Sequence, residues 1–466
     1  MAGTEKIPTS RVRRTATVGR LAATEAVKQF GTRAANVTRG ADAAEAALAR
    51  RQLETAKQIV AVLGTMKGAA MKLGQVMSFL DVGLVPEEFR EEFQHELAKL
   101  RDAAPTVSFK QMRRVIEDDL GEPVRKVFAS FEEEPIAAAS IGQVYRATLR
   151  EDGRAVAVKV QYPGVAAAVR ADLQNLDMIM RLLKRMTPQL DVKALAGEVR
   201  ERIVEELDYE LEAQNQRALG RIFRGHPFIV VPEVMSDLSR ERVLVSQLIE
   251  GVGFEQLKHS SQADRDRIGE IVFRFFLGCL YRHRQFSGDP HPGNFLALAD
   301  GRVAFLDFGL FKRMDPAAVE LELACQRAVS EQDAATLHKL LADSGFLPEP
   351  DRVDPNHLLA YVQDAIWWYT TDEVVELSPE IATAVLIESS DPRSSHFREM
   401  RHQSMRPEHL FGRRMEMLVL AVLAQLRARA NWHRIAREWM YGDDPVTDLG
   451  RQEAEFYGHA GVGAAG

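Results

Sequence analysis

Asp289, Asn294 and Asp307 have side chains of the types that hold Mg²⁺ in proteins, and they stand close together in the chain. Asp289 and Asn294 begin and end the segment Asp-Pro-His-Pro-Gly-Asn, in which two prolines and a glycine favour an irregular loop over a helix. Asp307 follows the apolar run Val303–Leu306 and precedes Phe-Gly, so we expect its carboxylate at the end of a strand. Carboxylate oxygen is a hard ligand that suits Mg²⁺. These residues therefore indicate a site for a metal bound by oxygen atoms.

Lys159 could supply the positive charge that a phosphate needs. It lies in the strand-like segment Ala155–Gln161, where three valines share one face and Lys159 shares the other with two alanines. A lysine on an inward strand face is costly unless a counter-charge and a phosphate neutralise it, and Glu212 on the following helical segment is the expected partner. Taken alone, the segment also fits an edge-strand lysine in solvent.

The order of these residues matches that of protein kinases. In the kinase catalytic loop an Asp and an Asn five positions apart orient the acceptor hydroxyl and bind Mg²⁺, which suggests these roles for Asp289 and Asn294. The Asp-Phe-Gly triplet follows, and Val243–Gly251 has the apolar strand and polar linker of a hinge, with Gln247 and Ile249 as nucleotide-binding positions. Each segment alone also fits a plain turn, a chance triplet or an ordinary strand. Their order and separations together favour a kinase-like site.

The segment that would cover the phosphates differs from that of an ordinary kinase. Kinases have a glycine-rich loop there, whereas the corresponding segment here, Pro135–Val144, contains three alanines and a serine at residues 137–140. Alanine allows close approach of the backbone but lacks the access of glycine to positive φ, so we expect a stiffer loop.

With these motifs the chain resembles the UbiB/AarF family of atypical kinase-like proteins. The resemblance covers about residues 60–315 and rests on five motifs: Lys-Leu-Gly-Gln at 72–75, the Ala-rich segment, Glu-Leu-Asp-Tyr and Glu-Ala-Gln-Asn within 206–215, Asp-Pro-His-Pro-Gly-Asn, and Leu-Asp-Phe-Gly. It implies an α+β, atypical protein-kinase-like, two-lobed fold with an N-terminal helical extension and a helical C-terminal region. It also implies ATP or ADP with Mg²⁺ as cofactors.

The resemblance implies roles for individual residues. Catalytic roles fall to Asp289, Lys159 and Lys72, and ligation of Mg²⁺ falls to Asn294 and Asp307. The implied nucleotide-binding set is Ala137, Ala138, Ala139, Ser140, Lys159, Glu212, Gln247 and Ile249. The implied gate over the active site, specific to this family, consists of Lys72, Gly74, Gln75, Glu206 and Asp208. In a continuous helix Asp208 and Glu212 share a face, whereas Glu206 is rotated by about 200° from Asp208, so Glu206 and Asp208 cannot both point straight at one ligand.

The predicted organisation has five parts along the chain. Residues 1–41 form a flexible basic arm, 42–120 the family-specific helical extension, 121–251 the kinase-like N-lobe and hinge, 252–455 the helical C-lobe, and 456–466 a flexible tail. Apolar periodicity predicts a long helix over about 194–219 and helices after about residue 315. Strands are expected at 127–131, 142–149, 155–161, 228–234 and 242–251.

Bulk properties exclude several classes of protein. The formal net charge of -7 argues against broad binding to nucleic acid, so none is expected as a partner. Cys279 and Cys325 are the two cysteines, and their spacing fits neither a zinc site nor a disulfide scaffold but small buried side chains in a reducing cytosol. We find neither a signal peptide nor about eighteen uninterrupted apolar residues. We therefore expect a cytoplasmic protein, at most peripheral to the inner face of the membrane.

The predicted function is that of an atypical kinase or ATPase that binds ATP and Mg²⁺. By family resemblance it would support isoprenoid-quinone biosynthesis or membrane-lipid homeostasis. Two alternatives stay open: a non-catalytic scaffold gated by nucleotide, and a small-molecule kinase of the aminoglycoside-phosphotransferase type. Besides ATP, the partners left open are an isoprenoid or lipid ligand, a peripheral membrane contact and a homodimer.

Overall fold

The computed structural model describes residues 107–139, 141–173, 192–388 and 407–460, and these divide into two compact units. Unit 1 contains the described residues up to Glu210 together with Ser236–Val245. Unit 2 contains Leu211–Met235 together with the described residues from Ser246 onward. Each unit is therefore assembled from segments that are not continuous in the sequence.

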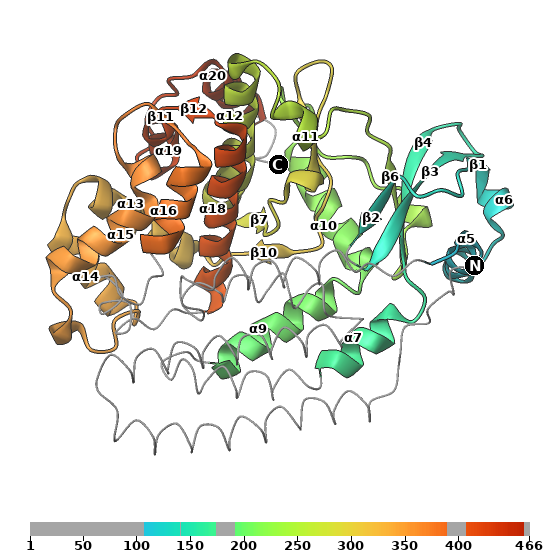
Figure 1. The fold of residues 1–466 in the computed structure, drawn as a ribbon, viewed down its shortest axis with the longest axis horizontal. Helices are drawn as coiled ribbons and strands as arrows, with labels where there is room; N and C mark the ends of the chain where they lie inside the picture. Colours follow the sequence, from blue (N-terminus) through green and yellow to red (C-terminus); the bar gives the residue numbers. More distant parts are fainter. Residues whose placement is uncertain (1–106, 140, 174–191, 389–406, 461–466) are drawn as a thin grey trace, which may run out of the picture. The chain divides into compact units, whose positions relative to one another are not determined.

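Unit 1 is built on a sheet in the order β1-β3-β4-β6, with β2 paired to β3 (Figure 1). The side chains of β4 alternate as expected, since Val156, Val158 and Val160 are fully buried while Lys159 on the other face is half-buried. The strands expected at 127–131, 142–149 and 155–161 are confirmed. The strands are β1 (Phe128–Phe131), β2 (Ala137–Ala139), β3 (Gly142–Leu149), β4 (Ala155–Gln161) and β6 (Val243–Gln247), and the helices are α5 (Phe109–Leu120), α6 (Val124–Val127), α7 (Val165–Leu173) and α9 (Val192–Glu205).

The Ala-rich segment is a strand rather than the expected loop. Ala137–Ala139 pair antiparallel with β3, with Ala139 opposite Gly142. A Cβ on Gly142 would lie 2.2 Å from the Val160 carbonyl oxygen, so this position accepts glycine alone. The stiffness predicted for the segment thus has a physical basis in strand pairing.

The single helix expected over 194–219 is two helices. α9 ends at Glu205, and α10 (Tyr209–Ile222) starts after a break. Gln161 Nε2 donates to the Leu207 carbonyl oxygen (2.8 Å), and the Tyr209 N–H donates to the Glu241 carbonyl (2.9 Å), so both groups bond outside the helical ladder. Asp208 then accepts the Glu210 N–H (2.9 Å) and begins α10. The rotation argued for Glu206 and Asp208 is therefore wrong, because it required a continuous helix.

Unit 2 is mainly helical and contains three small sheets. One sheet has the order β5-β9-β8, and the others are the pairs β10-β7 and β11-β12. The strands are β5 (Ile229–Val230), β7 (Gln285–Ser287), β8 (Phe295–Ala297), β9 (Val303–Phe305), β10 (Phe311–Arg313), β11 (Val375–Glu376) and β12 (Arg429–Ala430). The helices are α10, which belongs to unit 2 from Leu211 onward, α11 (Phe254–Leu257), α12 (Gln262–His283), α13 (Pro316–Ser330), α14 (Ala334–Asp343), α15 (Pro355–Thr370), α16 (Pro379–Glu388), α18 (Pro407–Leu426), α19 (Trp432–Met440) and α20 (Asp448–Ala460). The short 3-10 turns η3 (Pro292–Asn294) and η4 (Pro350–Arg352) also belong to unit 2, whereas η2 (Ser236–Leu238) belongs to unit 1.

Helix α12 is the centre of the unit 2 core. It is buried from Ile268 to Tyr281, and it packs along α18 (Figure 1). Phe275 of α12 stacks on Phe305 of β9 with ring centroids 3.6 Å apart, which ties the helix to the strand that leads into Asp307. This helix can be a core element although it contains Glu270 and Arg274, because the two charges pair with one another and Arg274 also pairs with Glu438 of another helix.

The C-terminal part is helical as predicted, with two additions. The short pair β11-β12 interrupts the helices after residue 315, and α20 continues to Ala460, past the expected boundary at residue 455. Cys279 and Cys325 are buried and form no disulfide, as expected. In the part of the chain that the structure describes, no helix has the length and apolar character needed to cross a membrane.

Candidate active site

The loop from Asp289 to Asn294 is held in shape by its own side chains. Asn294 Nδ2 donates to the Asp289 carbonyl oxygen (3.1 Å), and His291 Nδ1 accepts the Gly293 N–H (3.0 Å). The Asn294 N–H donates to the His291 carbonyl (2.9 Å), which closes the 3-10 turn η3. The predicted irregular loop is confirmed, and it joins Asn294 directly to Asp289.

Asp307 leaves the same end of a strand pair as Asn294. β8 follows Asn294 and lies antiparallel to β9, which precedes Asp307. The Leu306 N–H donates to the Asn294 carbonyl oxygen (2.8 Å), so the pairing extends beyond the strands themselves. The Asp307 carboxylate accepts the Gly309 N–H through Oδ1 (3.0 Å). The backbone thus brings the two predicted metal-binding residues together.

The antiparallel pair β7-β10 fixes the chain on both sides of Phe308. Ser287 Oγ donates to the Asp307 carbonyl oxygen (3.2 Å), and the Gly288 N–H donates to the Leu310 carbonyl oxygen (2.6 Å). Because β7 also leads into the loop at Asp289, this one strand positions both the loop and the Asp-Phe-Gly segment.

Helix α10 brings a second carboxylate to that segment. Glu212 is 3% exposed, and its Oε2 lies 3.4 Å from the place where a Cβ on Gly309 would stand, with Asp307 Oδ1 at 3.5 Å from the same point. Asn215, also 3% exposed, donates from Nδ2 to the Phe308 carbonyl oxygen (3.3 Å). The sequence motifs predict no separate role for Asn215. Its spacing of three residues from Glu212 puts both on one helical face and is the signal that would have found it.

The donor set of this segment fits Mg²⁺. Asn294 uses its amide nitrogen on Asp289, which leaves Oδ1 as the atom that could bind a metal, and the Asp307 carboxylate is oriented by its bond to Gly309. The described residues contain no group of three or more His, Cys, Asp and Glu side chains that could hold a metal by themselves. Mg²⁺ held here would therefore take further ligands from nucleotide phosphates and water, as is usual for this ion.

In unit 1, Lys159 lies over an aromatic ring. Its ammonium is 5.0 Å from the centroid of Tyr209, which is 1% exposed and begins α10. A cation over an aromatic face is attracted by the ring quadrupole, so Tyr209 helps to fix the position of the charge. Tyr209 ends the Glu-Leu-Asp-Tyr motif, which predicts no role for the tyrosine itself. Lys159 and Glu212 fall in different compact units, so their pairing stays a prediction.

The remaining predicted site residues have varied surroundings. Of the predicted hinge residues, Gln247 is exposed and its N–H donates to the Glu233 carbonyl (2.7 Å), and Ile249 is half-buried. Of the predicted gate residues, Glu206 is buried and Asp208 accepts a hydrogen bond at the start of α10. Ala137 and Ala138 are exposed on β2, and Ala139 is half-buried. Their contacts with a nucleotide stay predictions. Lys72, Gly74, Gln75 and Ser140 lie outside the described residues.

A hollow of about 500 Å³ lies elsewhere in unit 2, bordered by residues of α13, α15 and α19. Its lining includes Gln332, Asp372 and Arg437 but none of the predicted site residues. A hollow by itself does not make a functional site.

The chain matches a family model, and known proteins resemble it over most of its length. The model described as the ABC1 atypical kinase-like domain matches residues 99–341. "Atypical kinase coq-8, mitochondrial" from Caenorhabditis elegans is 31% identical over 354 residues, which cover 73% of this chain and 46% of that protein. "Protein ACTIVITY OF BC1 COMPLEX KINASE 1, chloroplastic" from Arabidopsis thaliana is 32% identical over 67% of this chain and 45% of that protein. The chain spans about half the length of these curated relatives.

A solved structure resembles this chain, and the similarity extends over nearly the whole of that solved chain. The structure of Rv3197 from Mycobacterium tuberculosis in complex with erythromycin is 31% identical, with a TM-score of 0.62, and the similarity covers 86% of this chain and 98% of that one.

Proposed function

Because the chain belongs to the ABC1 atypical kinase-like family and has a mixed helix and sheet fold of the protein-kinase-like type, we propose that it binds ATP or ADP with Mg²⁺ and hydrolyses ATP or transfers its γ-phosphoryl group. The observation that carries the proposal is the convergence on one backbone segment in unit 2. Asn294 and Asp307 leave the same end of β8-β9, and Glu212 approaches Gly309 from α10.

In this proposal Asn294 Oδ1 and the Asp307 carboxylate hold Mg²⁺, which supplies charge neutralisation at the phosphates. The bond from Asn294 Nδ2 to the Asp289 main-chain carbonyl keeps Asp289 in the same loop turn as Asn294. In this proposal the Asp289 carboxylate orients the acceptor hydroxyl or water and takes its proton. Lys159, steadied by Tyr209, neutralises the nucleotide phosphates, and β2 with Ser140 covers them.

Which molecule accepts the phosphoryl group depends on the predicted gate residues, which are Lys72, Gly74, Gln75, Glu206 and Asp208. If they close the groove in which a peptide would dock, then ATP hydrolysis or phosphorylation of a small molecule is favoured over protein phosphorylation. The break between α9 and α10 supports a specialised use of Glu206 and Asp208, because Gln161 and Glu241 hold that corner in unit 1.

We further propose that the activity supports isoprenoid-quinone or lipid chemistry, with peripheral membrane contact. The names of two relatives, a coq-8 kinase and a kinase named for activity of the bc1 complex, support the quinone part of this proposal. A non-catalytic scaffold gated by nucleotide is the competing proposal.

ATP turnover by the purified chain tests these proposals. We would compare wild type with Asp289→Asn, with and without anionic liposomes, an isoprenoid head-group analogue, and erythromycin, which is the ligand in the structure of the Mycobacterium tuberculosis relative. We expect Mg²⁺-dependent turnover that falls by about a hundredfold or more in Asp289→Asn, since general acid-base groups contribute about 10²–10⁴-fold. Nucleotide binding without turnover under any of these conditions would favour the scaffold.

A further inference from the structure

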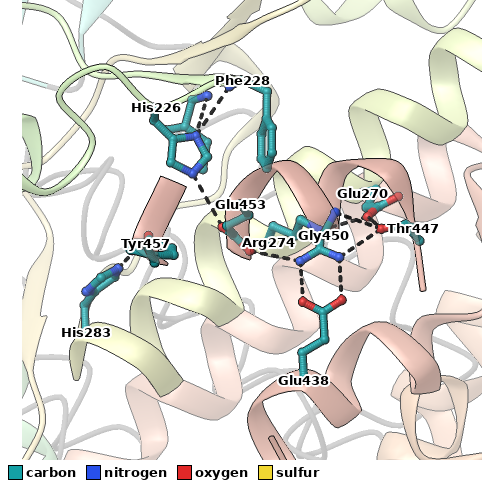
Figure 2. A network of polar contacts seen from close by, with 11 residues as sticks. His226, Phe228, Glu270, Arg274, His283, Glu438, Thr447, Gly450, Glu453 and Tyr457 are labelled. Carbon is teal, nitrogen blue, oxygen red and sulfur yellow. Dashed lines mark hydrogen bonds and ion pairs between the residues drawn. The ribbon is translucent and has the colours of Figure 1, made fainter. Parts of the chain in front are cut away.

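A buried arginine joins three segments of unit 2. Arg274 of α12 is 1% exposed, and its guanidinium contacts Glu270 of the same helix, Glu438 of α19, and Thr447 and Glu453 at α20 (Figure 2). Its Nε donates to Glu270 (2.8 Å), Nη1 to Glu438 (2.8 Å) and Glu453 (2.9 Å), and Nη2 to Glu438 (2.7 Å) and Thr447 (3.0 Å). All five N–H donors of the guanidinium are thereby used. We refer to these five residues as the Arg274 cluster.

The Arg274 cluster fixes the C-terminal helix α20. Thr447 Oγ1 accepts the Gly450 N–H (3.0 Å) and so caps the helix, and Glu453 reaches Arg274 from its second turn. A Cβ on Gly450 would lie 2.5 Å from Arg274 Nη2, so only glycine lets the helix approach the guanidinium this closely. Farther along α20, Tyr457 bonds His283 (2.8 Å). The helix is thus held along its length by buried and half-buried polar contacts.

His226 connects α20 to the end of α10. Its Nδ1 accepts the N–H groups of Ile229 (3.1 Å) and Phe228 (3.4 Å), so the ring carries its proton on Nε2. That nitrogen faces Glu453 Oε1 at 3.6 Å (Figure 2). Phe456 of α20 packs on the same ring at 4.8 Å between centroids. Burial lowers the pKa of His226 although Glu453 acts in the opposite direction, which agrees with a neutral ring.

From His226 two routes lead to the candidate active site. The first is α10, which ends just before His226 and carries Glu212 and Asn215, the latter bonded to the Phe308 carbonyl. The second is β5, whose first N–H group bonds to His226 and which pairs in parallel with β9, the strand that leads into Asp307. Both routes are short and consist of buried contacts.

We propose that α20 positions the candidate active site through Glu453 and His226, which act as positioning residues for Glu212 and Asp307. The physical reason is that His226 bonds both to Phe223, at the end of α10, and to Ile229, at the start of β5. Glu453 faces His226 Nε2 with one carboxylate oxygen and pairs with Arg274 through the other, so it connects His226 to the Arg274 cluster. The inference rests on the proposed function for its consequence in nucleotide binding, but its structural part can be tested without any nucleotide.

The structural part is tested by hydrogen exchange of the nucleotide-free protein in Glu453→Gln. Glutamine offers one acceptor oxygen to two donors, so either Arg274 or His226 must face an amide NH₂. Glu455→Gln is the matched control, because Glu455 lies two residues away on the same helix and is exposed. We expect amide exchange in 209–222 and 303–310 to rise by about tenfold in Glu453→Gln and to stay unchanged in Glu455→Gln.

A second variant separates positioning from folding. His226→Asn keeps an acceptor near Nδ1 for the β5 N–H groups but loses the donor that faces Glu453, and it leaves the bonds of Arg274 intact. We expect exchange in 448–460 to stay as in wild type while exchange in 209–222 rises.

The functional part is measured as the Mg²⁺ concentration for half-maximal binding of ADP, at a temperature where every variant is folded. We expect Glu453→Gln and His226→Asn to raise it by about tenfold and Glu455→Gln to leave it unchanged. If Glu453→Gln only lowers the melting temperature, with exchange in 209–222 and 303–310 and the Mg²⁺ dependence as in wild type, the inference is wrong. If wild type binds no Mg²⁺–nucleotide, the proposed function is wrong, and the exchange measurements still decide the inference.

Discussion

At the residue scale, the Asp307 side chain is held in place by the chain around it, which suits the metal-binding role that we propose for it. Its Oδ1 accepts the Gly309 N–H, its main-chain carbonyl accepts from Ser287 Oγ, and Glu212 Oε2 approaches the same side of Gly309 as Asp307 Oδ1. A carboxylate that already accepts a backbone hydrogen bond loses little further conformational entropy if it binds an ion.

Asp307→Asn should abolish the Mg²⁺-dependent part of thermal stabilisation by nucleotide. The amide keeps an acceptor for Gly309 but removes the charge that holds the ion. Ligand at about 100 times its Kd stabilises a protein by about 2.7 kcal/mol, so the loss is easily seen in a melting experiment. Asp343→Asn, on an exposed ion pair of α14, is the control. The same shift with Mg²⁺ and ATP in Asp307→Asn as in wild type would mean that Asp307 is not a metal ligand.

In unit 1, Tyr209 lies under the ammonium of Lys159, and we expect Tyr209→Leu to weaken nucleotide binding. Removing the ring under Lys159 deletes an interaction of about 0.5–2 kcal/mol, or roughly two- to thirtyfold in affinity. Tyr209→Phe keeps the ring and should bind nearly as wild type does. Binding by isothermal calorimetry, with circular dichroism to confirm folding, compares the two. Equal affinities in the leucine and phenylalanine variants would rule out a role of the ring in holding Lys159.

At the element scale, the Ala-rich strand β2 replaces a glycine-rich loop, and its pairing with β3 limits how far it can bend. Ala138→Gly should raise the affinity for ATP relative to ADP, because glycine releases the backbone to follow the terminal phosphate. Ala138 is exposed and opposite Gln143, so the fold should tolerate the change at a cost of about 0.5–1 kcal/mol. Competition of a fluorescent nucleotide by ATP and by ADP gives the ratio. An unchanged ratio would show that β2 does not cover the phosphates.

The break between α9 and α10 is also decided at this scale. Apolar spacing runs through it without interruption, and Leu207 remains buried at 2% exposure. Gln161 of β4 and Glu241 before β6 take the backbone groups that would have continued the helix. The cause of the break thus lies 46 residues away in the chain.

At the scale of the whole molecule, buried histidines make the stability depend on pH. Burial lowers the pKa of His226, His433 and His283, in the last case to about 4. The unfolded chain takes up protons below the ordinary value of 6.5 while the folded chain does not, so the stabilisation is present above about pH 6.5 and is lost as the pH falls toward 4. Burial would raise the pKa of Glu453, but His226 and Arg274 more than offset this, so its contribution is likewise lost in acid.

His283→Gln should therefore make the pH dependence of unfolding shallower between pH 6.5 and 4. The amide can keep the bond to Tyr457 but does not titrate. One proton bound by the unfolded but not the folded chain changes the free energy of unfolding by about 1.4 kcal/mol per pH unit. Urea unfolding of unit 2 followed by its tryptophan fluorescence gives the slope, with the exposed His259→Gln as control. A slope as steep as that of wild type would show that His283 does not contribute.

The sequence by itself determined the parts of this protein that depend on neighbours in the chain. Strand alternation around Lys159, the irregular loop at Asp289, the strand end at Asp307 and the buried cysteines follow from local residue types and spacing, and the structure agrees with each. The motif order also indicated the ABC1 kinase-like family, which the family match shows independently.

Only the tertiary structure decided what depends on residues far apart in the sequence. Asn215 on Phe308, Tyr209 under Lys159, and the link from His226 to Glu453 each join segments from different elements. The pairing of β2 and the end of α9 were decided in the same way, by partners in other strands. A polar group is satisfied by whichever partner the fold brings within about 3 Å, and periodicity along one segment carries no information about that partner.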